Sequence, residues 1–111
     1  MLWLVLYHPE AMVERDALPA AERAAIDHAV EKLESLGPNL GYPHSSNVPS
    51  AVNLRELRPR GGRSRWRAFY SGVGAAFVIG AIGPEAGVHR RGFARAVVAA
   101  EERIKDVEEE W

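Results

Sequence analysis

The sequence predicts an α+β domain in which two helices pack on an antiparallel sheet. Two observations lead to this prediction. Apolar residues recur at three- and four-residue spacing over residues 19–36 and 92–110, which is the period of an amphipathic helix. Between these segments, residues 53–58, 64–71 and 75–82 are strand-like and are separated by glycine-rich turns, which is the pattern of an antiparallel meander.

The remaining elements follow in chain order. Residues 2–7 are continuously apolar or aromatic and are expected to form the first strand. The first helix is expected to begin at Pro19, which suits a first helical position, and to end before Gly37-Pro38. Residues 37–51 lack an apolar period, so we expect an ordered loop there. Residues 1–111 are expected to form a single domain, with one sheet face left open for binding.

The composition excludes several classes of protein. The chain has no cysteine, which rules out disulfides, thiolate metal sites and cysteine nucleophiles and fits the cytoplasm. The opening apolar run is far shorter than the ~20 residues of a membrane span, so no membrane partner is expected. No metal or organic cofactor is expected either.

Charge is distributed unevenly along the chain. The formal net charge is −1, but residues 55–95 hold nine arginines against two acids, Glu56 and Glu85, so this stretch carries +7 and the remainder −8. The nine are Arg55, Arg58, Arg60, Arg63, Arg65, Arg67, Arg90, Arg91 and Arg95. Such a density predicts a basic surface for a polyanion such as RNA. The alternative is a solvated sheet face that pairs with helix acids.

Alternation along the strands adds aromatic rings to this surface. Arg65 and Arg67 share one side of the segment 64–71, while Trp66 and Tyr70 share the other. Arginines interleaved with aromatic rings can hold single-stranded RNA through phosphate contacts and base stacking. Tyr70 also has a simpler interpretation as a core ring, because aromatic residues in strands usually serve packing.

Four short runs carry a family resemblance. They are LRELR at 54–58, WRAFY at 66–70, FVIGAI at 77–82 and FARAVVAAEERI at 93–104. In this order and spacing the chain resembles the RelE/HigB toxin superfamily, and specifically its phage Gp49-like branch, over roughly residues 18–107.

The resemblance implies a RelE-like fold and the toxin of a type II toxin–antitoxin system. Such a toxin is a metal-independent mRNA endonuclease that often acts on ribosome-bound mRNA, and its partners are a cognate antitoxin, mRNA and the ribosome. Arg58 matches the arginine of the family's ELR motif, Arg67 that of its YR motif, and Tyr70 its second aromatic. These three are expected at the catalytic site, with Arg55 and Arg65 as supporting RNA contacts.

One departure from the family pattern matters. The family usually carries two lysines after its last strand, where this chain has Gly83-Pro84. His89, Arg90 and Arg91 could replace them, with His89 in proton transfer and the arginines as RNA contacts. His89 could equally be an ordinary residue at the start of a helix, and Glu85 either a base or a salt-bridge partner. The missing lysines also favour a second hypothesis, a non-catalytic relative that binds RNA or protein.

Overall fold

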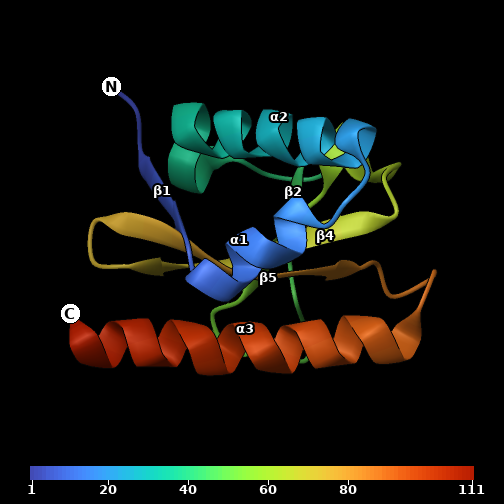
Figure 1. Ribbon diagram of the computed structural model, residues 1–111. Helices are drawn as coiled ribbons and strands as arrows, with labels where there is room; N and C mark the ends of the chain where they lie inside the picture. The colour runs from blue at the N-terminus through green and yellow to red at the C-terminus, as the bar shows by residue number, and fades with distance from the viewer.

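A computed structural model describes residues 1–111 as a five-stranded sheet with helices on both faces (Figure 1). The strands are β1 (Leu4–Tyr7), β2 (Ser45–Asn47), β3 (Arg55–Leu57), β4 (Trp66–Val73) and β5 (Ala76–Pro84). The helices are α1 (Pro9–Asp16), α2 (Ala20–Leu36) and α3 (Arg90–Glu110), with short 3₁₀ turns η1 (Gly37–Asn39) and η2 (Pro59–Gly62). The sheet order is β1-β5-β4-β3-β2. The α+β class and the meander β3-β4-β5 are confirmed.

The expectation of an open sheet face is wrong. Residues such as Ile26 and Leu33 of α2 pack with Leu57 and Ile79 of the sheet on one face. On the other face, Val97 and other residues of α3 pack with a second set of strand residues that includes Phe69. Figure 1 shows α2 and α3 as the two outer layers with the sheet between them. Each helix must bury its apolar stripe, and a five-stranded sheet offers one face to each. No helix has both the length and the apolar character needed to cross a membrane.

The sheet is mixed rather than wholly antiparallel. β1 pairs in parallel with β5, from Leu4 beside Ala76 to Tyr7 beside Ile79. The other neighbouring strands are antiparallel, as expected for short turns. Parallel strands need a long connection between them. Here the connection from β1 to β5 includes α1, α2, β2, β3 and β4. The local sequence around β1 therefore carried no information about whether this strand pairs in parallel or antiparallel fashion.

Two short elements were not expected from the sequence. α1 begins at Pro9, where His8 Nδ1 accepts a hydrogen bond from Glu10 N at 3.1 Å. Its Glu14 carboxylate accepts from Ile82 N and from Arg103 Nη1, both at 3.0 Å, so α1 is fixed to β5 and α3 by contacts distant in sequence. β2 lies inside the expected loop 37–51 and pairs with β3.

Glycine allows α3 to lie close to β5. A Cβ atom added to Gly80 would lie 2.9 Å from the Cα and carbonyl oxygen of Ala100. Those are backbone atoms and cannot move independently of the helix. Gly83 stands in the same position against Ala96 one turn earlier. The helix and the sheet are therefore in direct backbone contact near the end of β5.

Substituting Gly80→Ala is expected to lower the free energy of unfolding by about 1–3 kcal/mol, because the added methyl group must push α3 away from the sheet. Gly41→Ala is the matched control, since nothing lies within 4 Å of a Cβ at that position. Urea unfolding followed by circular dichroism measures both. Equal stability of the two variants would contradict the close packing.

Candidate nucleic-acid interface

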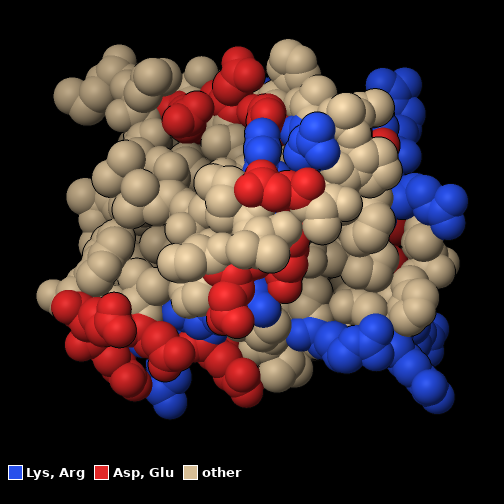
Figure 2. All heavy atoms as spheres, in the orientation of Figure 1, with Lys and Arg blue, Asp and Glu red and all other residues tan.

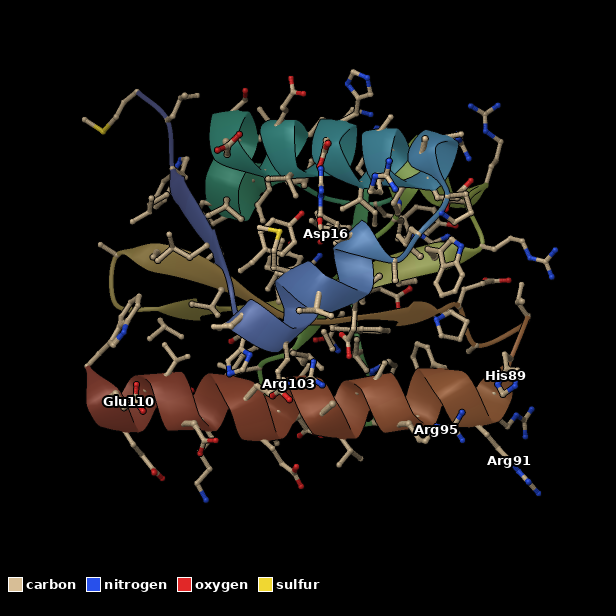
Figure 3. All side chains as sticks on the ribbon, viewed as in Figure 1. Asp16, His89, Arg91, Arg95, Arg103 and Glu110 are labelled. Atoms are coloured by element: carbon tan, nitrogen blue, oxygen red, sulfur yellow. The ribbon has the colours of Figure 1, made fainter.

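Five exposed arginines gather at one end of the molecule. They are Arg63 and Arg65, just before β4, and Arg90, Arg91 and Arg95, in the first turns of α3. We call this set the basic end. None of the five forms an ion pair within the chain, and only Arg63 makes a side-chain hydrogen bond, from Nε to the carbonyl oxygen of Arg60 at 3.0 Å. Figure 2 shows lysine and arginine atoms along the right side of the molecule, where Figure 3 labels His89, Arg91 and Arg95.

Strand pairing brings the two halves of the basic end together. The start of β4 lies beside the end of β5, with Trp66 opposite Pro84. The pairing extends one step further, since Glu85 N donates to the carbonyl oxygen of Arg65 at 2.9 Å. A tight turn then leads from Glu85 to His89 and into α3. Arginines that are about twenty-five residues apart in sequence thus share one surface.

Three other arginines of the basic stretch are held by protein groups. Arg55 donates to Ser45 Oγ at 3.0 Å. Arg58 donates to the carbonyl oxygen of Pro43 and to Glu56, and its guanidinium lies 5.1 Å from the ring centre of Tyr42. Arg60 pairs with Glu22 at 2.8 Å. This partner, together with Ser64, lowers the pKa of Glu22. Pairing with a helix acid, as in the alternative interpretation, therefore occurs for Arg60, whereas the acid that pairs with Arg58 lies in β3.

Arg67 lies in the interior and joins three segments of the chain. Only 1% of its side chain is exposed. Its Nη1 donates to the carbonyl oxygens of Ser64 and Trp66, and its Nη2 to that of Gly62 and to Glu85 Oε2 at 3.2 Å. Nε lies 3.4 Å from Glu56 Oε1, which is an ion-pair distance without hydrogen-bond geometry.

This placement changes the role of Arg67. Burial lowers the pKa of its guanidinium, and the nearby Arg58 lowers it further, while Glu56 and Glu85 oppose that shift. A phosphate contact requires an exposed guanidinium, and here both Nη groups of Arg67 already donate to protein acceptors. Arg67 instead fastens η2 and the turn after β5 to the sheet. These are the segments that lead into the two halves of the basic end.

Tyr70 also lies in the core, as its simpler interpretation stated. Its hydroxyl is 2.6 Å from Ser45 Oγ, and its ring meets Phe77 edge-on. With Phe69 and Tyr70 both buried, the expected platform of arginines and aromatic rings on the sheet is not exposed. Glu85 fits the salt-bridge interpretation through Arg67, although its Oε1 makes no hydrogen bond within the chain.

His89 caps α3. Its Nδ1 accepts a hydrogen bond from Gly92 N at 2.8 Å. This nitrogen must therefore be unprotonated, and in the neutral ring the proton lies on Nε2. The exposed imidazole thus offers a donor to a ligand, whereas its acceptor nitrogen is used by the helix.

The charges along α3 run against its own dipole. Its first turns carry Arg90, Arg91 and Arg95, and residues 101–110 carry six acids against two bases. A helix is stabilised by acids near its start and bases near its end, and α3 has neither. The arrangement costs stability locally and concentrates positive charge where the helix N-terminus already attracts anions. Such an arrangement favours the binding of anions at this end of the helix.

The sequence predicted Arg65, Arg90 and Arg91 as individual RNA contacts, whereas Arg63 and Arg95 were only counted within the basic stretch. The spacing of four between Arg91 and Arg95, which places both on one side of a helix, was the available signal for Arg95. Arg63 has no comparable signal, because it lies in a turn.

Comparison with known proteins places this geometry in a family. No curated protein matches the sequence. A mutant of the E. coli toxin RelE in the free state has a similar structure, with a TM-score of 0.63 and 13% identity over 87% of this chain and 96% of that one. A chain in the crystal structure of the archaeal RelE–RelB complex from Pyrococcus horikoshii gives a TM-score of 0.55 and 20% identity over 76% of this chain and 96% of that one. Residues 14–79 match the family described as phage-derived protein Gp49-like. Since this match spans more than half of the sequence, the chain belongs to the phage-derived Gp49-like family.

Proposed function

We propose that this protein is the toxin of a type II toxin–antitoxin pair and that it cleaves mRNA, on the ribosome, in the cytoplasm. The observation that supports this most directly is the basic end, with five exposed arginines free of ion pairs on a RelE-like fold. A folding-only sequence gains nothing from crowding like charges at a helix N-terminus. RNA phosphates would neutralise them.

The chemistry of cleavage assigns roles to the groups at this end. The ribose 2′-oxygen attacks the neighbouring phosphorus while a base takes its proton, and the bond to the 5′-oxygen breaks as that oxygen gains a proton. The arginines of the basic end would bind the phosphates and stabilise the negative charge that develops on them in the transition state. They are Arg65, Arg90 and Arg91, together with Arg63 and Arg95. Glu85 Oε1 is the carboxylate oxygen free to act as the base, and His89 Nε2–H a donor to the phosphate. Arg58 and Arg67 would support this surface from beneath.

A partner protein belongs to this proposal. The P. horikoshii structure is a complex of RelE with RelB. By analogy, a small antitoxin would bind this chain and block its activity. Co-expression of the gene next to its own should then restore growth to cells that express the toxin.

The proposal is tested by induced expression in a bacterial host, with growth and primer extension on mRNA as readouts. We expect growth arrest and discrete cuts for the wild type, and neither for the double variant Arg91→Glu/Arg95→Glu at equal soluble protein. Purified ribosomes programmed with mRNA, compared with free mRNA, test the dependence on the ribosome. Unhindered growth with soluble wild-type protein would contradict the nuclease.

A second candidate, an RNA-binding module that does not cleave, is favoured by one observation. The arginine that matches the family's YR motif is buried, and the ring nitrogen of His89 that could act as a base is used by the helix cap. This candidate expects RNA binding by the basic end without growth arrest and without cuts. The same expression experiment, followed by RNA binding in vitro, separates the two.

A further inference from the structure

One edge of the sheet is left uncovered. β1 is the outermost strand, and its only neighbour is β5. His8 N donates to the carbonyl oxygen of Ile79 at 2.9 Å. In a parallel strand, the main-chain N–H and C=O groups of every second residue point toward the neighbouring strand. The main-chain groups of Leu4 and Leu6 therefore point toward β5, as those of His8 do. Val5 and Tyr7 therefore point theirs outward, where the chain supplies no partner.

The rest of the same edge is capped by side chains. Where β5 continues beyond β1, Ile82 N donates to Glu14, and the carbonyl oxygen of Gly80 accepts from Arg103 Nη1 at 3.0 Å. β1 has no comparable cover. Sheets usually protect an exposed edge strand with charged residues or proline, and residues 1–7 contain neither.

The surface around β1 is apolar. Leu2 is 70%, Leu4 56% and Trp3 43% exposed. The exposed Leu36 lies nearby, because Trp3 N donates to the carbonyl oxygen of Glu34 near the end of α2. Figure 2 shows an uncharged area on the left of the molecule, where Figure 1 shows β1. An open strand edge combined with an apolar surface is the pattern of a strand-pairing interface.

We propose that β1 pairs in antiparallel fashion with β1 of a second copy of the chain, which joins the two sheets into one. In a twofold dimer, the same surface of both copies forms the interface. The basic end and the acidic half of α3 would then repel their own copies. Residues 1–7 carry no charged side chain, so two β1 strands can meet without repulsion between their own side chains.

The free hydrogen-bonding groups of the main chain determine the register in which the two β1 strands pair. Trp3 N is already used by Glu34, which leaves Val5 and Tyr7 as the outward residues. Antiparallel pairing that uses both places Val5 opposite the partner's Tyr7, and Leu6 opposite the partner's Leu6. Leu4 and Leu6 then lie on one face of the joined sheet with the same residues of the second copy. The basic end of each copy stays exposed, because it lies at the far end of β5 from the residues that pair with β1.

The assembly is tested first by mass. Size-exclusion chromatography with light scattering at micromolar concentrations should give twice the chain mass of 12.2 kDa for the wild type. Leu4→Lys replaces an exposed apolar residue of the proposed interface with a charged one in each copy and should give the single-chain mass with an unchanged circular dichroism spectrum. Val98→Lys, at an exposed position of α3, is the matched control and should remain a dimer. A monomeric wild type, or a Leu4→Lys variant that still dimerises, would overturn the proposal.

The register is tested by cross-linking, which the absence of native cysteine makes simple. Leu6→Cys should form an intermolecular disulfide on mild oxidation, because directly opposed residues have Cα atoms about 4.5–5.5 Å apart. Leu4→Cys should not, since its two copies would be offset by four residues, or about 13 Å. Equal cross-linking of both variants, or of neither, would sink this register and with it the β1 interface.

Discussion

Replacing Arg67 with methionine is expected to lower the free energy of unfolding by about 3–5 kcal/mol, although the residue matches a family position expected to contact RNA. The change leaves the carbonyl oxygens of Gly62 and Ser64 without donors in the interior. It also leaves the buried Glu56 carboxylate with less compensating charge. Urea unfolding measures the loss, and Arg67→Lys should recover only part of it because an ammonium group cannot donate in the same fork.

Two controls separate a structural role of Arg67 from a ligand contact. Arg65→Met removes an exposed arginine two residues away and should change stability by less than about 0.5 kcal/mol. Arg67→Met combined with Glu56→Met should cost less than the sum of the single changes, because the buried carboxylate that loses its partner Arg67 is removed with it. If Arg67→Met is as stable as the wild type and only RNA binding is lost, Arg67 is a ligand contact and its fastening role is wrong.

Reversing two charges of the basic end, Arg91→Glu/Arg95→Glu, is expected to weaken binding of single-stranded RNA about a hundredfold without loss of stability. Each arginine lost from a phosphate contact should also lower the salt dependence of binding by about one counterion. Stability should rise slightly, because Arg91 lies in the first turn of α3, where a glutamate is favoured. Fluorescence anisotropy and thermal unfolding measure the two effects.

The double variant is expected to lose RNA affinity while its stability rises slightly, and this combination distinguishes a lost RNA contact from misfolding. A variant that binds less RNA because it is misfolded would lose both affinity and stability. Lys105→Glu is the matched control, because it reverses an exposed charge in the acidic half of the same helix and should leave RNA affinity unchanged. Unaltered binding by the double variant, or an equal loss in the control, would show that the basic end is not the RNA surface.

The sequence by itself determined the long elements and the family. In α2 and α3 the apolar residues repeat with the helical period, and this signal lies within the segment itself. The meander β3-β4-β5 was predictable for the same reason, since glycine-rich turns fix antiparallel neighbours locally. α1 escaped prediction because its eight residues depend on Glu14 bonding to Ile82 and Arg103, which are distant in sequence.

The tertiary structure alone decided which arginines face solvent. The concentration of arginine between residues 55 and 95 predicted a basic surface, and a basic surface is present. Arg65 and Arg67 lie two residues apart, yet one is exposed and the other buried. Arg67 is buried because Glu56, Glu85 and the carbonyl oxygens of a folded turn surround it, whereas Arg65 precedes the strand and has no acid within reach. Exposure of a charge depends on partners that only folding brings near, and a linear pattern does not contain them.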